Sequence, residues 1–185
     1  GIPMAFEIVA GLIQPACWVP SPNYSSRPNQ TDISLLVVHN ISLPPGEYGG
    51  GYIEAFFQNR LNEQAHGYFA SIAHMKVSAH CLIDRCGVLT QFVNLQERAW
   101  HAGVSCFEGR ENCNDYSIGV ELEGTDEEAF TPQQYQTLAR LSAALMQQYP
   151  LIEPSRIVGH SHIAPGRKTD PGPGFNWNYF HQTLC

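Results

Sequence analysis

The sequence is short of positive charge, with 10 Lys and Arg against 17 Asp and Glu among 185 residues and a formal net charge of −7. Proteins that bind nucleic acid need clustered positive charge, so this composition argues against a nucleic-acid partner. The chain also lacks any apolar run near the roughly 18 residues of a membrane span, so we expect no membrane partner. With 43% apolar and 15% charged residues, it can bury a substantial core within one domain.

Two common metal motifs are also missing. The six cysteines form no CxxC pair, which argues against a cysteine zinc site, and no HExxH motif of a zinc peptidase is present. We expect the thiols to be idle or buried. A bridge between Cys106 and Cys113 is left open.

The first residues carry two expectations about processing. Gly1-Ile2-Pro3 stands before Met4, so we interpret residues 1–3 as a remnant of engineering, Met4 as the native start and residues 4–185 as one domain. The stretch "MAFEIVAGLIQPACWVP" that follows has no basic start, and Glu7 interrupts its apolar part. It is a poor signal peptide, and we expect the protein to be cytoplasmic.

Strand and helix patterns alternate along the chain. Apolar runs predict strands at residues 33–39, 76–84, 87–93, 117–124 and 156–160, and helical spacing predicts helices at 53–61 and 131–149. Thr131, Pro132 and Gln134 form a capping box with proline at the first helical position. Residues 18–32 and 40–52 are expected to be loops, and residues 85–87 a tight turn. The interleaving predicts an α/β domain with a mixed central sheet flanked by helices.

Three possible metal ligands stand out. His39 and His160 each lie where a predicted strand ends, and binding sites gather at strand ends. Asp170 precedes Pro171, which restricts its backbone and should aim its carboxylate. A zinc hydrolase holds its metal with three protein ligands and keeps a fourth position for water. Each histidine could equally be a satisfied structural group, and His162 is a rival ligand.

Acidic and basic partners for such a metal are also present. Glu121 and Glu123 alternate with apolar residues, so both point to one face, where they could act as acid or base or form a solvated strand face. Lys168 should share a face with Asp170 and could stabilise developing negative charge, or be an ordinary surface lysine.

Six segments together suggest a family: "VVHNISLPPGEYGGGYI", "HGYFASIAHMKVSAHCLI", "RAWHAGVS", "CNDYSIGVELEGTD", "GHSHIAP" and "RKTDPGPGF". In this order they closely resemble type 2 N-acetylmuramoyl-L-alanine amidases, in particular the cytoplasmic anhydro-muramyl-L-alanine amidases of bacterial wall recycling. The wider group includes phage-type amidases and peptidoglycan recognition proteins. The likeness runs from about Trp18 to Asn178. It implies the peptidoglycan recognition protein/amidase-like fold, a mixed sheet flanked by helices.

The resemblance implies roles for particular residues. It places zinc on His39, His160 and Asp170, makes Glu121 rather than Glu123 the general base and later acid, and makes Lys168 the stabiliser of the oxyanion. The implied substrate is a small anhydro-muropeptide, cut between N-acetylmuramic acid and L-alanine. The resemblance also implies a link to β-lactamase induction, and we expect a monomer.

The resemblance further places Asn40, Tyr68, Lys76 and Trp100 in the substrate cleft. Relatives often carry Arg where this chain has Lys76 and Asn112. Because lysine lacks the bidentate grip of arginine on a carboxylate, recognition of the stem peptide could differ, with Arg110 as a possible substitute.

Two other functions remain open on the sequence alone. A binding module on the same fold would hold muropeptide without cutting it, but such proteins lose a zinc ligand and this chain has all three. An exported amidase acting on intact wall would need a signal sequence, which the pattern at the start of the chain does not resemble.

Overall fold

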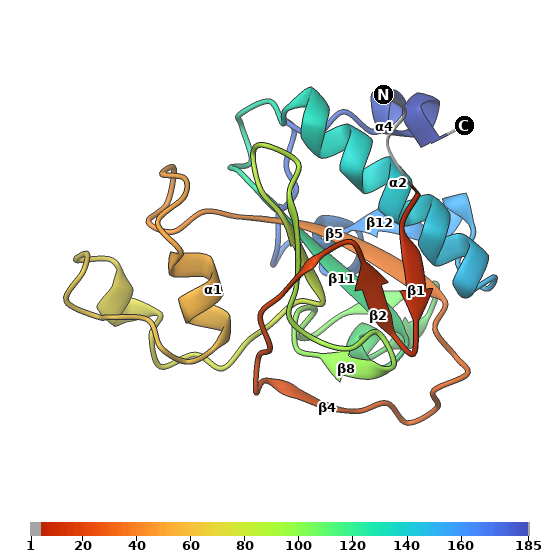
Figure 1. Cartoon of the computed structure of the whole chain (residues 1–185), viewed down its shortest axis with the longest axis horizontal. Helices are drawn as coiled ribbons and strands as arrows, with labels where there is room; N and C mark the ends of the chain where they lie inside the picture. Colours follow the sequence, from red (N-terminus) through yellow and green to blue (C-terminus); the bar gives the residue numbers. More distant parts are fainter. Residues whose placement is uncertain (1–4, 185) are drawn as a thin grey trace.

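The structure is a computed structural model that describes residues 5–184. The predicted remnant at residues 1–3 and the predicted native start at Met4 lie outside the described residues. Figure 1 shows the course of the chain, with strands near the centre and helix α2 (Pro132–Gln148) lying across them.

A six-stranded sheet forms the centre of the fold. Its strands, in spatial order, are β12 (Ile157–Gly159), β5 (Leu35–Ile41), β11 (Ser117–Glu123), β6 (Cys81–Ile83), β7 (Leu89–Gln91) and β3 (Cys17–Trp18). The first four run parallel, β6 and β7 are antiparallel, and β3 pairs with β7 in parallel. The predicted class, a mixed sheet flanked by helices, is confirmed.

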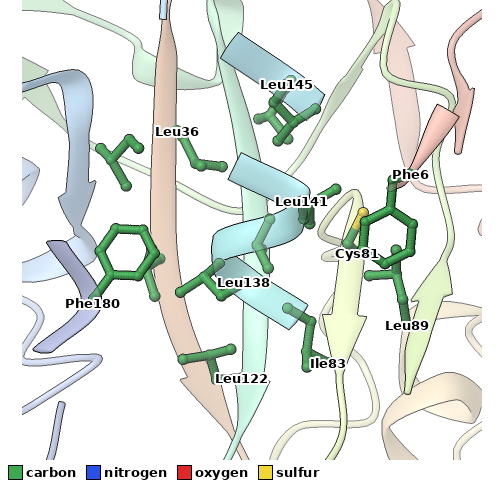
Figure 2. Packing of buried hydrophobic residues seen from close by; sticks show 14 of the residues in the cluster. Phe6, Leu36, Cys81, Ile83, Leu89, Leu122, Leu138, Leu141, Leu145 and Phe180 are labelled. Carbon is green, nitrogen blue, oxygen red and sulfur yellow. The ribbon is translucent and has the colours of Figure 1, made fainter. Parts of the chain in front are cut away.

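Helix α2 covers one face of this sheet. Thr131 caps the helix by accepting a hydrogen bond from the Gln134 backbone N–H, and the Gln134 side chain accepts one from the Thr131 N–H, as predicted. Figure 2 shows Leu138, Leu141 and Leu145 packed against the strands, beside Leu36 of β5, Leu122 of β11 and Phe180. The apolar stripe of α2 thus fixes which face of the sheet is the main core.

The opposite face of the sheet is covered by shorter elements. Helix α1 (Tyr52–Phe57) packs Ile53, Phe56 and Phe57 against Leu82 of β6. Figure 1 shows α1 and α2 on opposite sides of β5 and β11. Because alternate strand residues point to opposite faces, every second residue of β5 and β11 faces away from α2.

Several segments differ from the sequence-based expectation. The stretch at 18–32, expected as loop, contains β4 (Tyr24–Ser26), which pairs with β8 (Glu97–Ala99). The apolar stretch near the start of the chain, which was judged a poor signal peptide, contains a hairpin of β1 (Glu7–Val9) and β2 (Leu12–Gln14). Such short strands leave no periodic signal, and β4 in addition depends on a partner far along the chain.

The strand expected at 76–84 is confirmed only for Cys81–Ile83, and the helix expected at 53–61 ends at Phe57. The remaining helices and strands are α3 (His160–Ile163), α4 (Trp177–Leu184), β9 (Cys106–Phe107) and β10 (Arg110–Glu111). Short 3₁₀ turns lie at Phe69–Ser71, Cys113–Asp115 and Pro154–Arg156. Helix α4 was not predicted.

The predicted turn between β6 and β7 is confirmed. Gly87 has a φ of +83° there, and a Cβ would lie 2.8 Å from the backbone oxygen of Gln133, so glycine is needed for the turn to pass under α2.

The described cysteines are free thiols, which removes the possible Cys106–Cys113 bridge. Among the described helices, none combines the length and apolar character that a bilayer crossing requires.

Candidate active site

The register of the two central strands places a histidine beside a glutamate. Residues of β5 and β11 pair in parallel, with His39 opposite Glu121. Alternate residues of each strand point to opposite faces of the sheet, and His39 and Glu121 belong to the set that faces away from α2. Both side chains therefore point to the face that α2 does not cover. The predicted strand-end histidine therefore lies next to the predicted base.

The other two predicted ligands approach from the C-terminal part of the chain. His160 begins α3 directly after β12, which pairs with β5 on the side away from β11. Asp170 lies in the loop that follows α3. The backbone oxygen of Asp170 accepts a hydrogen bond from the Ser161 N–H. The short α3 and its return loop thus carry both ligands to the end of β5.

These three residues form one cluster that could hold a metal ion. Nδ1 of His39 lies 3.0 Å from Nδ1 of His160 and 3.1 Å from Oδ2 of Asp170, and His160 Nδ1 lies 3.2 Å from the same carboxylate. Around a tetrahedral zinc ion with bonds of about 2.0–2.1 Å, ligand atoms are about 3.3 Å apart. Two buried imidazoles and a carboxylate at this spacing fit a divalent metal.

The carboxyl of Glu121 borders the same position. Its Oε1 lies 3.6 Å from Nδ1 of His39, and the residue is 7% exposed. Burial raises the pKa of Glu121 well above its ordinary value, the negative charge of Asp170 raises it further, and Lys168 partly opposes both. A carboxyl with a raised pKa is a stronger base than an ordinary glutamate, which suits a group that takes a proton from water.

Glu123, two residues along the same strand face, has a different environment. It is also buried, so the alternative of a solvated strand face is wrong for both glutamates. Its carboxylate accepts hydrogen bonds from the backbone N–H groups of Gly49 (2.8 Å) and Arg85 (3.2 Å). Glu123 therefore ties two loops to β11 and is outside the ligand cluster.

The charges of the cluster depend on one another. Burial alone would raise the pKa of Asp170, but hydrogen bonds with His160 and His39 hold it below its ordinary value. Burial lowers the pKa of His39, although Asp170 opposes the shift. Metal binding needs Asp170 ionised and His39 neutral, and both shifts favour these states.

The loop that carries Asp170 is held on both sides. Nδ2 of Asn40 donates to Oδ1 of Asp126 (2.7 Å) and to the backbone oxygen of Pro171 (3.1 Å), and the Thr169 hydroxyl donates to Oδ2 of Asp126. Asp126 was not identified from the sequence. Its position three residues after the strand end at Glu123 is the one signal that could have indicated it.

A cleft of about 840 Å³ opens above the cluster. It is lined by His39, Glu121, His160, Lys168 and Asp170, and also by Asn40, Tyr68 and Trp100, three of the four residues predicted to contact substrate. Lys76, the fourth, lies between the lining residues Met75 and Val77 but is exposed and does not line the cleft itself.

Arg167, which was not among the site residues predicted from the sequence, lies at this cleft. Arg167 lines it, while Nη2 donates to the backbone oxygens of Ala102 and Val104. Arg110, considered as a substitute for the missing arginines, pairs instead with Asp32 at 2.7 Å and lies over the ring of Tyr116, outside the cleft lining.

The rival ligand His162 does not join the cluster. Its Nδ1 accepts a hydrogen bond from the Gly159 N–H at 2.8 Å, and its ring packs against Trp177. The geometry therefore selects His160 over His162.

Several known proteins are similar to this chain in sequence and in structure. The family profile described as N-acetylmuramoyl-L-alanine amidase matches residues 29–173. The 1,6-anhydro-N-acetylmuramyl-L-alanine amidase AmpD of Haemophilus influenzae is 53% identical over 174 residues, covering 94% of this chain and 95% of that protein.

Among solved structures, the crystal structure of a selenomethionine AmpD derivative superimposes with a TM-score of 0.93 at 54% identity, over 96% of this chain and 99% of that one. The amidase AmiD of Escherichia coli, in complex with anhydro-N-acetylmuramic acid-L-Ala-D-γ-Glu-L-Lys, gives a TM-score of 0.62 at 26% identity, over 97% of this chain and 65% of that one.

Proposed function

Since this chain belongs to the N-acetylmuramoyl-L-alanine amidase family, we propose that it uses a zinc ion on His39, His160 and Asp170 to hydrolyse anhydro-muropeptides. The chain is an N-acetylmuramoyl-L-alanine amidase, and its curated relatives act as 1,6-anhydro-N-acetylmuramyl-L-alanine amidases. The bond cut joins the lactyl carbonyl of anhydro-N-acetylmuramic acid to the nitrogen of L-alanine, and the reaction belongs to peptidoglycan recycling.

One observation carries the proposal. A cluster of two imidazoles and a carboxylate lies at the bottom of a cleft, and the buried carboxyl of Glu121 lies 3.6 Å from one of the ligand nitrogens. Imidazole and carboxylate donors suit zinc, and three protein ligands with an open fourth position are typical of catalytic zinc sites.

When bound here, zinc would supply Lewis-acid chemistry that polarises the scissile carbonyl and acidifies the attacking water. Glu121 takes a proton from that water as it attacks the carbonyl carbon. The carboxyl then passes this proton to the alanine nitrogen, which leaves as an amine when the C–N bond breaks. The raised pKa of Glu121 makes it a stronger base for the first step.

Lys168 has the position to stabilise the oxyanion. It lines the cleft, and its charge acts on both Glu121 and His39. A fixed cation near the developing negative charge lowers the barrier most when the charge forms in a dry, confined site.

The remainder of the cleft would hold the sugar and stem peptide. Tyr68 and Trp100 offer aromatic surface, and Asn40 keeps only its side-chain oxygen for substrate because its amide hydrogens bind Asp126 and Pro171. Arg167 is a better placed cation than Lys76 for an acidic group of the peptide. The cytoplasmic location, the link to β-lactamase induction and the monomeric state stay predictions.

The test is hydrolysis of anhydro-muramyl tripeptide followed by mass spectrometry. We expect free tripeptide and anhydro-sugar, loss of both products with a chelator, and recovery when zinc is added. Intact substrate in the presence of zinc-loaded protein would instead favour a binding module or another muropeptide.

Two matched variants sharpen the assignment of the base. Glu121→Gln should keep zinc but lose at least 10²-fold in turnover, the usual scale for a missing general base. Glu123→Gln changes the same group two residues away on the same strand face and should retain turnover. Equal activity of the two variants would refute the role of Glu121.

A further inference from the structure

Each candidate ligand histidine has a second ring nitrogen that points away from the cluster. Nε2 of His39 lies 2.8 Å from Nδ1 of His101, and Nε2 of His160 lies 2.9 Å from the backbone oxygen of Ala102. The two outer nitrogens, 121 positions apart in the chain, therefore meet two consecutive residues.

We propose that the dipeptide His101–Ala102, fixed by the side chain of Asn114, is a shared outer support that orients both histidine ligands for the metal. The inference rests on the proposed zinc function. It assigns His101 and Asn114 as positioning residues, since neither belongs to the ligand cluster.

The hydrogen-bond chemistry fixes the direction of each bond. A backbone oxygen can only accept, so Nε2 of His160 carries the proton and Nδ1 keeps its lone pair for the metal. If His39 binds metal through Nδ1, its Nε2–H donates to Nδ1 of His101. His101 then carries its own proton on Nε2, which lies 3.0 Å from the hydroxyl of Ser117 and can donate to it.

Asn114 holds the dipeptide from behind. Its Oδ1 accepts hydrogen bonds from the backbone N–H groups of both His101 (3.1 Å) and Ala102 (2.8 Å). Asn114 is itself 7% exposed, and Ala102 is fully buried. Arg167 also donates to the Ala102 oxygen at 2.7 Å. Three hydrogen bonds, two to Asn114 and one from Arg167, therefore hold the backbone of the dipeptide.

The neighbouring strand is shaped to admit the His101 ring. Gly119 lies on β11 two residues before Glu121, and a Cβ there would lie 2.5 Å from the ring of His101. Only glycine leaves room for the ring against the strand. The same ring contact thus sets His101 between β11 and the end of β5, within reach of His39.

Outer-shell partners of this kind fix the tautomer and ring orientation of a ligand, and losing one typically weakens metal binding by about 10–100-fold. A purely structural role would instead lower folding stability without a specific effect on the metal. The two roles can be separated because asparagine and leucine have nearly the same shape, while only asparagine offers an acceptor close to where histidine has Nδ1.

The experiment compares His101→Asn with His101→Leu in the full chain. We would measure the zinc dissociation constant by competition with a chromophoric chelator, and the thermal midpoint of the metal-free proteins. His101→Leu should weaken zinc binding about 10–100-fold, and His101→Asn should restore most of it at a similar thermal midpoint. Unchanged zinc affinity in the leucine variant, or equal weakening in both, would overturn the proposal.

Asn114 provides a second pair in case His101→Leu does not fold. Asn114→Asp keeps an acceptor for both N–H groups, and Asn114→Leu removes it, so zinc affinity should fall in the leucine variant alone. Equal affinities in this pair would overturn the shared support. Wild-type protein that hydrolyses anhydro-muramyl tripeptide but binds no zinc would instead refute the proposed function, and the support with it.

Discussion

His80 should make this protein sensitive to acid, and the size of the effect follows from its surroundings. The side chain is fully buried, its Nδ1 accepts from the Gly119 N–H at 3.1 Å, and Nε2 lies 2.8 Å from the backbone oxygen of Glu97. Burial and the nearby charge of Arg27 lower the pKa of His80 from 6.5 to about 3. The folded protein thus keeps this imidazole neutral.

The sign follows from proton binding in the two states. Below pH 6.5 the unfolded chain gains a proton at this residue, and the folded protein gains it only near pH 3, so acid favours unfolding. Between pH 7.5 and pH 5.0 this one group should remove about 2 kcal/mol from the free energy of unfolding.

The measurement is urea unfolding of the wild type and His80→Gln at several pH values between 5.0 and 7.5, with zinc absent throughout. Glutamine can still donate to the Glu97 oxygen but cannot gain a proton in this range. The variant should be less stable at pH 7.5, by about 1–3 kcal/mol for the acceptor it takes from Gly119, and should lose about 2 kcal/mol less than the wild type on acidification.

Ile83→Val is the control for lower stability alone. It trims a buried core side chain at a cost of about 1 kcal/mol, and its stability should fall with pH in parallel with the wild type. If His80→Gln also runs parallel to the wild type, the folded protein already accepts a proton at His80 and the reasoning fails.

Three further predictions concern catalysis and folding. Lys168→Ala should lower kcat by on the order of 10²–10³ while zinc affinity, measured by chelator competition, stays unchanged; equal rates would remove Lys168 from oxyanion stabilisation. Leu138→Ala should lower the free energy of unfolding by about 2–5 kcal/mol, because it opens a cavity between α2 and the sheet, with little change in kcat of the folded enzyme. Thr131→Ala should cost about 1 kcal/mol, since it removes the hydrogen bond to the Gln134 N–H that caps α2; chemical denaturation would check both values.

The long, strongly patterned elements could be predicted because their signals are local. β5, β11 and α2 follow the expected positions to within a few residues, since a continuous β-branched run, an alternating strand and a capped amphipathic helix each bury their apolar side in only one way. The hairpin at Glu7–Gln14 was missed because its three-residue strands are too short to show a period. Strand β4 was missed because its partner β8 lies far along the chain, with Tyr24 opposite Ala99.

The candidate ligands also depend partly on local sequence signals and partly on the packing of distant segments. Their residue types, their places at strand ends and the restricted backbone before Pro171 pointed to His39, His160 and Asp170. The residue pattern alone left His160 and His162 as rivals, and the resemblance implied His160. Helix α3 turns the imidazole of His160 toward His39 and that of His162 toward Trp177. The alternating pattern alone did not distinguish the two glutamates of β11, and the resemblance implied Glu121. In the structure, the environments of the two carboxyl groups differ.

The sequence by itself determined the kinds of chemistry available and the strands that carry them, because residue type and backbone propensity are properties of short segments. Only the tertiary structure decided that Glu121 stands opposite His39, that Asn114 holds His101 and Ala102, and that both candidate ligand histidines meet the same dipeptide. Strand register and loop closure are set by packing between distant segments, and no single segment contains that information.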